Sequence, residues 1–225
     1  ADWISESFPG QFRNWFYSLL TMSTVLENTQ PTECIFGYAL MRDENGEEMH
    51  KSRGNAIWFD DAAEDIGTDI MRWLFSNHNP SLNLNFGHSI ANEVKRQFFI
   101  PLWNTYNFFA TYASLDEFNP NENQLTEPIQ SIDKWILSEL NTLIRNITND
   151  MDNYDLSAPS KRIEEFTDIL SNWYVRRSRR RFWKSENDTD KYNAYSTLFI
   201  CLSTLTKLLS PFVPFTAETI YQNLV

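Results

Sequence analysis

The stretch IDKWILSELNTLIRNI, residues 132–147, decides the fold of this 225-residue chain. Its apolar side chains recur every three or four residues, which places them on one face of an α-helix. Stripes of the same kind run through residues 94–109, 163–173 and 195–209. Because apolar stripes on successive helices are buried only against one another, the sequence predicts a helical bundle from about residue 88 onward.

Particular residues add detail to this bundle. Pro101 lies inside the first stripe and predicts a kink, and Pro211 predicts the end of the last helix. Trp173 ends the third stripe, so it is predicted to face the core. The polar segment 119–128 is expected to be a solvated linker between helices.

The first 87 residues mix helix and strand signals. Residues 15–26 have the pattern of an amphipathic helix, and the apolar run 35–41 favours a strand. Asn45-Gly46 predicts a hairpin turn, because these residue types adopt the positive φ angles that tight hairpins need. Periodicity stops and polarity rises between residues 77 and 85, so we expect a domain boundary close to residue 87.

Two short helices are expected in the middle of this first part. Asp61 and Glu64 have the spacing of a capping box, which predicts a helix start, and Gly67 predicts the end of that helix. A second helix is expected from Thr68, with Trp73 on its buried side.

Composition narrows the class of protein. Hydrophobic residues make up 42% of the chain, which argues against disorder, and a count of only 6 glycines favours helices over a loop-rich β fold. Cys34 and Cys201 belong to no disulfide or zinc-finger pattern and fit a reducing, cytoplasmic compartment. The most apolar stretch, 198–215, is interrupted by Lys, Ser, Thr and Pro, so it predicts a buried helix and no membrane span.

The net charge of −11, taken as an average, argues against nucleic-acid binding, because phosphate contacts need basic side chains. The distribution of charge changes that conclusion. Six of the 19 basic residues fall within nine positions: Arg176, Arg177, Arg179, Arg180, Arg181 and Lys184. The rest of the chain has 13 basic residues against 30 acidic ones. An acidic protein with one basic stripe directs a nucleic acid to that stripe.

The expected helical geometry brings these cations together. Arg176, Arg180 and Lys184 share one line along the helix, with Arg177 and Arg181 beside it. We interpret this stripe as a contact for RNA phosphates, with Trp183 available to stack an unpaired base. The alternative is a solvated face whose arginines pair with acidic neighbours, namely Glu164, Glu165 and Glu186.

The polar loop 48–55 combines residue types that bind phosphate. Lys51 supplies a positive charge, Ser52 supplies a hydroxyl, and Gly54 lets a ligand approach the backbone N–H groups. On spacing alone, the alternative interpretation is an ordinary surface loop with an exposed lysine.

Four segments, in this order, resemble the isoleucyl branch of the class I aminoacyl-tRNA synthetases. They are QFRNWFY at 11–17, MHKSRGN at 49–55, NWYVRR at 172–177 followed by RRFW at 180–183, and LSPFVPFTAE at 209–218. The first segment favours the isoleucyl over the valyl and leucyl branches. Valyl-tRNA synthetase or another branched-chain synthetase is the alternative within the class, and a non-catalytic RNA-binding helical scaffold is the alternative outside it.

The resemblance implies a mainly α fold in two domains. Residues 1–87 would be the C-terminal portion of a Rossmann-like catalytic domain with the ATP loop, a short α/β remnant, and residues 88–225 would be a truncated helical anticodon-binding domain. The reaction it implies is the activation of isoleucine by ATP with Mg²⁺, followed by transfer to tRNA(Ile) in the cytoplasm. No metal bound by the protein and no membrane partner are expected.

The chain is expected to be a piece of a longer enzyme. It begins at Ala1 without a methionine and stops at Val225 inside an amphipathic pattern. The His-x-x-His motif that precedes the ATP loop in the family is absent from these residues. We therefore expect this piece to be inactive by itself.

The resemblance also implies roles for individual residues. Lys51 matches the second lysine of the family's ATP loop, which neutralises charge on the phosphates in the transition state, and it is the predicted catalytic residue. The predicted loop also includes Met49, His50, Ser52, Gly54 and Asn55. Gln11 and Trp15 match positions of the amino-acid site, and Glu6 is a further candidate there. The alternative role for Trp15 is core packing alone.

The loop departs from the family pattern at two positions. Glu48 stands where the family has its first lysine, and His50 stands where it has a serine. With one cation fewer, neutralisation of the phosphates falls mainly on Lys51.

Overall fold

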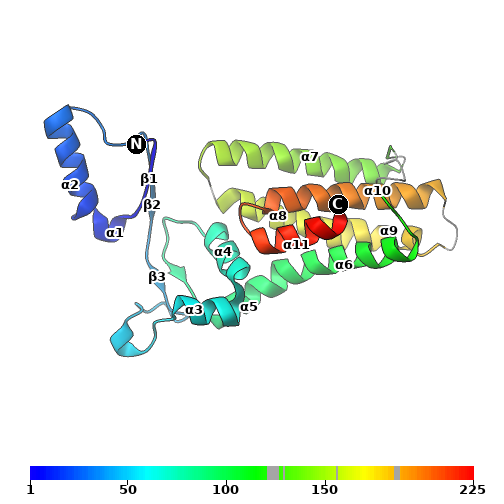
Figure 1. Ribbon diagram of the computed structural model, residues 1–225, viewed down its shortest axis with the longest axis horizontal. Helices are drawn as coiled ribbons and strands as arrows, with labels where there is room; N and C mark the ends of the chain where they lie inside the picture. Colours follow the sequence, from blue (N-terminus) through cyan, green and yellow to red (C-terminus); the bar gives the residue numbers. More distant parts are fainter. Residues whose placement is uncertain (121–126, 129, 156, 185–187) are drawn as a thin grey trace. The chain divides into compact units, whose positions relative to one another are not determined.

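The computed structural model describes residues 1–120, 127–128, 130–155, 157–184 and 188–225. Two compact units divide the chain, residues 1–65 with 78–91 in one and residues 66–77 with 92–225 in the other. Most of the predicted linker 119–128 and the predicted acidic partner Glu186 lie outside the described residues. Figure 1 labels the helices and strands of both units.

The first unit is a small α/β structure. Its strands are β1 (Trp3–Ser7), β2 (Cys34–Tyr38), β3 (Met41–Arg42) and β4 (Leu84–Asn85), and its helices are α1 (Phe8–Gln11), α2 (Trp15–Met22), α3 (Phe59–Ala62) and the start of α5 (His88–Val94). β1 and β2 pair in parallel, as do β3 and β4. Parallel strands need a crossover connection, and α1, α2 and a π-helical turn over Ser23–Glu27 supply it between β1 and β2.

The predicted hairpin turn forms, and the predicted strand forms in two pieces that are separated at Ala39 and Leu40. The apolar run 35–41 forms most of β2 and begins β3. At the turn, the Asp43 N–H donates to the Glu47 carbonyl at 2.9 Å. Gly46 has a φ of +82°, a left-handed conformation in which a side chain would be strained.

Two expectations for the helices of this unit need correction. The prediction that a capping box at Asp61 starts the helix is wrong, because α3 begins at Phe59 and Asp61 already lies in its first turn. The amphipathic helix over 15–26 forms as α2 and its π-helical extension, but Phe16 is its only buried side chain in the described structure. The predicted stop at Gly67 is confirmed by its φ of +100°.

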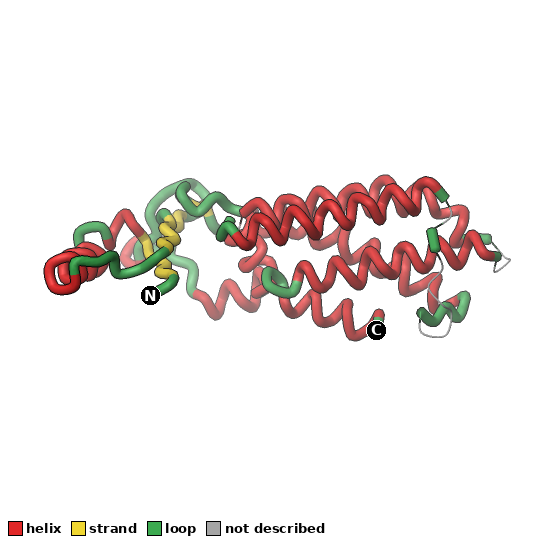
Figure 2. Tube along the Cα trace, turned by 90° about the horizontal axis from the view of Figure 1, so that it is seen from above, coloured by secondary structure: helices red, strands yellow, loops and turns green. Residues whose placement is uncertain are grey.

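The second unit is the predicted helical bundle. Its helices are α4 (Thr68–Asn77), α6 (Ile100–Leu115), α7 (Ser131–Asp152), α8 (Ser157–Asp168), α9 (Arg176–Phe182), α10 (Thr189–Leu209) and α11 (Pro214–Leu224). The long helices run alongside one another in both views (Figures 1 and 2). α10 is central, because it packs against α6, α7, α8, α9 and α11.

The core follows the apolar stripes that the sequence shows. Ile136 and Leu140 of α7 are buried against the wholly buried Leu198, Leu202 and Leu205 of α10 and the other members of one cluster. The helix predicted to stop at Pro211 ends at Leu209. Among the described residues, no helix combines the length and the apolar character that crossing a membrane requires.

α4 packs with this bundle although it precedes residue 87 in the sequence. Its Trp73 is fully buried, as predicted, and stacks on Phe98 with 3.8 Å between ring centroids. Asp69 accepts the backbone N–H of Thr216 at 2.6 Å, and the Arg72 guanidinium donates to the Phe212 carbonyl at 2.8 Å. These contacts attach α4 to the start of α11.

Two π-helical turns alter the predicted helices. The first, Lys95–Phe99, lies directly before Pro101, where the sequence predicts a kink. The second, Ile169–Val175, joins α8 to α9 and adds a residue to the helical turn, which shifts the faces of the helix. Tyr174 consequently points inward with no exposed surface. Trp173 is 50% exposed, so its predicted burial is wrong.

Candidate ATP loop and nucleic-acid interface

The predicted phosphate loop forms one tight turn on the first unit. His50 is extended, and Lys51–Arg53 make a single turn of 3₁₀-helix. Gly54 ends this turn with a φ of +71°, which favours glycine at that position. Lys51, Ser52 and Arg53 are exposed, so a cation, a hydroxyl and a second cation all face solvent.

Lys51 has an aromatic neighbour. Its Nζ lies 4.5 Å from the centroid of the exposed Trp58 ring, at cation–π distance. His50 Nε2 lies 3.4 Å from a carboxylate oxygen of Glu48, the residue that replaces the first lysine of the family loop. Met49 is half-buried.

Asn55 differs from the other loop residues because its side chain faces the loop itself. Its Oδ1 accepts the His50 N–H at 2.9 Å. Its Nδ2 donates to the Asp43 carboxylate at 2.8 Å and to the Glu48 carbonyl at 3.1 Å. The amide therefore closes the loop across its base.

The predicted amino-acid site residues gather at or after the carboxyl end of β1. Glu6 lies in β1 and its Oε1 accepts the Ser7 N–H at 2.9 Å. Gln11 ends α1 and its Oε1 accepts the Trp15 N–H at 3.2 Å. Trp15 is 49% exposed, so it does not serve as a core residue in this structure. The carboxyl end of parallel strands is where ligands bind in open α/β sheets.

A shallow hollow lies at the same end of the sheet. It is lined by Pro9, Phe12, Gly37, Tyr38, Ala39 and Ser81. None of the predicted amino-acid site residues is among them. The hollow belongs to the first unit alone.

The basic stripe splits into an exposed and a paired part. Arg176, Arg177, Arg179 and Arg180 are exposed on α9 and are called the arginine face below. Trp183 is 54% exposed just after the helix. The Arg177 guanidinium lies 4.6 Å from the centroid of the Trp173 ring, so this tryptophan joins the same surface. The sequence signal that could have found Trp173 is its spacing of four residues from Arg177.

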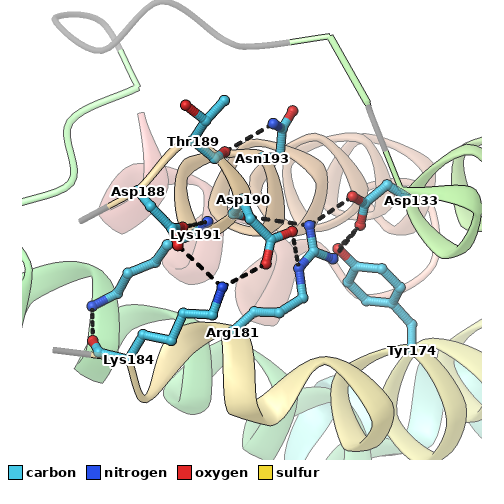
Figure 3. A network of polar contacts seen from close by, with 9 residues as sticks. All are labelled: Asp133, Tyr174, Arg181, Lys184, Asp188, Thr189, Asp190, Lys191 and Asn193. Atoms are coloured by element: carbon cyan, nitrogen blue, oxygen red, sulfur yellow. Dashed lines mark hydrogen bonds and ion pairs between the residues drawn. The ribbon is translucent and has the colours of Figure 1, made fainter. Parts of the chain in front are cut away.

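Arg181 belongs to a buried ion-pair network instead (Figure 3). Its Nη1 and Nη2 donate to the two oxygens of Asp133 at 2.7 and 2.8 Å. The Tyr174 hydroxyl donates to Asp133 at 2.8 Å. Burial, together with the Asp133 charge, raises the pKa of Tyr174 well above its usual value, so this hydroxyl remains a donor.

Asp190 extends the network to the end of the arginine helix. It forms ion pairs with Arg181 Nε at 2.9 Å and with Lys184 Nζ at 2.9 Å. Lys184 also pairs with Asp188, and the hydrogen bonds that its ammonium group donates to Asp190 and then to Asp188 raise the pKa of this lysine. α9 ends at Phe182, so the predicted alignment of Lys184 with Arg176 along one helix is wrong.

The acidic partners differ from those that the sequence suggested. In the described structure, the cations of α9 and its C-terminal end pair with Asp133, Asp188 and Asp190, and none of them pairs with Glu164 or Glu165. Asp133 is completely buried at the start of α7. Sequence reasoning missed it because a single acidic residue in an apolar stripe carries no local sign of a distant partner.

We predict that the Asp133–Arg181 pair stabilises the bundle strongly. Replacing Asp133 by Ala should lower the free energy of unfolding by about 3–5 kcal/mol, because the largely buried Arg181 keeps only Asp190 as a counter-charge and the buried Tyr174 hydroxyl loses its acceptor. Arg176→Ala is the control and should change it by less than about 0.5 kcal/mol, because Arg176 is exposed. Urea unfolding measures both. A loss below about 1 kcal/mol for Asp133→Ala would contradict a stabilising role.

Comparison with known protein families identifies the class. Residues 1–87 match the family described as tRNA synthetases class I (I, L, M and V), and residues 133–225 match the anticodon-binding domain of tRNA ligase. The chain belongs to the class I aminoacyl-tRNA synthetases.

Within that class, the chain is similar along its whole length to isoleucine–tRNA ligases, which confirms the resemblance of the four motifs. It is 48% identical over 226 residues to that of Dehalococcoides mccartyi strain 195 and 46% identical over 228 residues to that of Clostridium novyi. In both cases the match covers all of this chain and 22% of the relative. The chain therefore spans about a fifth of the length of these relatives.

Solved structures share the fold at low sequence identity. Mycobacterium tuberculosis methionyl-tRNA synthetase in complex with methionyl-adenylate matches 98% of this chain and 43% of its own, with a TM-score of 0.76 and 18% identity. The ternary LeuRS–tRNA–LeuAMS complex of Agrobacterium radiobacter K84 matches 100% of this chain and 27% of its own, with a TM-score of 0.67 and 15% identity. The mainly helical fold with a small strand remnant is thus confirmed.

Proposed function

We propose that this chain works within an isoleucine–tRNA ligase, where it supplies the ATP loop and a tRNA-binding helix. The observation that carries the proposal is 48% identity to such a ligase through the entire chain. In the proposed reaction the isoleucine carboxylate attacks the α-phosphate of ATP and pyrophosphate leaves. The aminoacyl group then passes to the terminal ribose of tRNA(Ile).

Lys51 is the proposed catalytic residue of this chain. Lys51 is exposed in the turn of the loop, with its ammonium group over the exposed Trp58 ring, and from there it can reach phosphates and offset the charge that develops on them. Ser52 is exposed on the same turn and adds a neutral hydroxyl donor, while the N–H groups of Arg53 and Gly54 are used in hydrogen bonds within the turn. Mg²⁺ would accompany the ATP phosphates and supply further positive charge there.

The end of β1 is the proposed side of the amino-acid site. Glu6, Gln11 and Trp15 reach this end from the strand and the two helices that follow it. The exposed indole of Trp15 offers an apolar wall for a branched aliphatic side chain. A wall of this kind separates isoleucine from valine by only about 1–3 kcal/mol.

The arginine face is the proposed contact for tRNA. Its four guanidinium groups are exposed on one short helix, where they can bind successive phosphates. Trp183 and the Trp173–Arg177 pair offer aromatic surface on which an unpaired base can stack. Because Arg181 and Lys184 are held by aspartates, we assign them a supporting role and leave phosphate contact to the arginine face.

We further propose that residues 1–87 belong to the catalytic domain and residues 88–225 to the anticodon-binding domain. The two family matches, 1–87 and 133–225, support this division. α4 belongs to the first domain by sequence but packs with α11 in the second compact unit, and the loop and the arginine face lie on separate units.

A chimaeric enzyme tests the proposed function. This chain replaces the aligned 226-residue segment of the Dehalococcoides ligase, and isoleucine-dependent ATP–pyrophosphate exchange is measured. We expect the chimaera to exchange pyrophosphate and to charge tRNA(Ile), and the 225-residue chain alone to do neither, because it supplies one part of the site. Valine-dependent activity that exceeds isoleucine-dependent activity would favour a different branched-chain synthetase. A folded but inactive chimaera that still binds tRNA would favour an RNA-binding scaffold.

A further inference from the structure

Asp43 lies in the hairpin turn before the Lys51 loop, outside every motif that the sequence analysis selected. Its Oδ1 accepts the backbone N–H groups of Asn45 at 3.0 Å and Glu47 at 2.9 Å. Its Oδ2 accepts the side-chain amide of Asn55 at 2.8 Å. The two carboxylate oxygens therefore have separate tasks, since one shapes the turn and the other reaches the loop.

The turn is itself fixed to the rest of the first unit. The Glu44 carboxylate accepts the Ser89 hydroxyl at 2.7 Å and also the Ser89 N–H. A Cβ at Gly87 would lie 2.1 Å from Glu44 Cγ, so a residue with a side chain at position 87 would displace Glu44. The Arg42 guanidinium donates to the Gly46 carbonyl at 3.0 Å. Asp43 thus projects from a fixed support.

We infer that Asp43 is a positioning residue for the catalytic loop and sets the place of Lys51 by holding Asn55. The side-chain amide of Asn55 makes three hydrogen bonds, with His50, Glu48 and Asp43. The first two lie within the loop, and the third connects the loop to the turn. The placement of the loop stands on these contacts alone. Its consequence for the reaction rests on the proposed function.

The charge of Asp43 strengthens this contact. The hydrogen bond from Asn55, followed by those from the turn, lowers the pKa of the Asp43 carboxyl, so the group is ionised at neutral pH. A hydrogen bond to an ionised acceptor is stronger than one between neutral groups. Since the folded pKa is the lower one, the contact is complete above the usual aspartate pKa and weakens as the pH falls through the lowered value.

The variant Asp43→Asn separates the two tasks. Its remaining carbonyl oxygen can still accept the turn N–H groups, but its NH₂ faces the NH₂ of Asn55, so the link to the loop is lost. We expect trypsin to cleave the 225-residue chain after Lys51 and Arg53 about tenfold faster, because cleavage follows the population of the open loop. Glu47→Gln is the matched control, with the same loss of charge in the same turn, and should cleave like the unchanged chain.

A swapped pair provides the decisive comparison. Asn55→Asp alone should also open the loop, because two carboxylates then face each other. In the double variant D43N/N55D, the new amide at position 43 donates to the new carboxylate at position 55, and cleavage should become slower than in Asn55→Asp alone, although the Glu48 carbonyl remains without its donor. Equal cleavage in Asp43→Asn and Glu47→Gln, or a double variant as open as Asn55→Asp alone, would overturn the inference.

The chimaeric ligase gives the kinetic consequence. Asp43→Asn should lower kcat for isoleucine-dependent pyrophosphate exchange by about tenfold or more while the KM for isoleucine stays unchanged. A misplaced Lys51 stabilises the transition state less well but does not affect the binding of the amino acid. An active chimaera in which Asp43→Asn changes nothing would refute the role of Asp43 in the reaction. An inactive chimaera with normal cleavage behaviour would refute the proposed function and leave the placement of the loop intact.

Discussion

Replacing Arg176, Arg179 and Arg180 together by glutamate should weaken tRNA binding by about 100-fold at low salt, because three phosphate contacts of roughly 1 kcal/mol each become repulsive or are lost. The three side chains are exposed, so the fold should not change. The dependence of the binding constant on salt should also become shallower, with the logarithmic slope falling by about 2–3. Titration of the 225-residue chain with tRNA at several salt concentrations measures both effects.

The control for this experiment has the same change in charge at other exposed cations. Lys95, Lys134 and Arg145 are exposed on other helical segments of the same unit. Their joint replacement by glutamate should leave most of the affinity and the salt slope in place. Equal losses for the two triple variants would show that tRNA responds to net charge and not to the arginine face.

Replacing Lys51 by Ala in the chimaeric ligase should lower kcat for pyrophosphate exchange by about 100- to 1000-fold, the usual cost of removing one charge-stabilising donor from an acyl-transfer or phosphate site. The effect should be large because Glu48 and His50 remove other cationic support from this loop. The KM for isoleucine should stay nearly constant, since Lys51 acts on the phosphates. Steady-state exchange at varied ATP and isoleucine separates the two constants.

Lys134→Ala serves as the control for the loss of an exposed lysine. It lies on α7 in the other unit and should exchange pyrophosphate at the unchanged rate. A decrease of less than about fivefold for Lys51→Ala would mean that Arg53, His50 or a residue outside this chain neutralises the phosphates. Arg53→Ala then becomes the variant to compare.

The two proposed functions lie on separate compact units, and the residues that support each site are acidic. Asp43 contacts the candidate ATP loop through Asn55, and Asp133 pairs with Arg181 of α9. With the charged residues arranged in this way, a net charge of −11 is compatible with binding a polyanion. Some of the acidic residues fix basic elements in place, and four exposed arginines are concentrated on α9.

Local patterns were sufficient to predict several parts of the fold. The apolar stripe of residues 132–147 became α7, and Asn45-Gly46 became a hairpin turn. The helix stop at Gly67 also formed as expected. These features depend on residues only a few positions apart, through side-chain spacing or backbone φ angles, so the sequence alone is sufficient to predict them.

Other features depended on contacts between distant residues and could not be predicted. The capping box at Asp61 failed because the helix begins two residues earlier, after Trp58. Trp173 turned outward because a π-helical turn shifted the face of its helix. The burial of Asp133 and its pairing with Arg181, 48 residues later, required α7 and α9 to be packed together first.

The sequence by itself determined the class of this protein, its helical second half, and the residue types of its loop and basic helix, because motifs and periodicity are local properties. Only the tertiary structure decided which of those residues are free to act. It left Lys51 and four arginines exposed, placed Arg181 and Lys184 in ion pairs, and turned Asn55 toward Asp43. The physical reason is that burial and charge pairing depend on which distant side chains meet, and that is settled by packing.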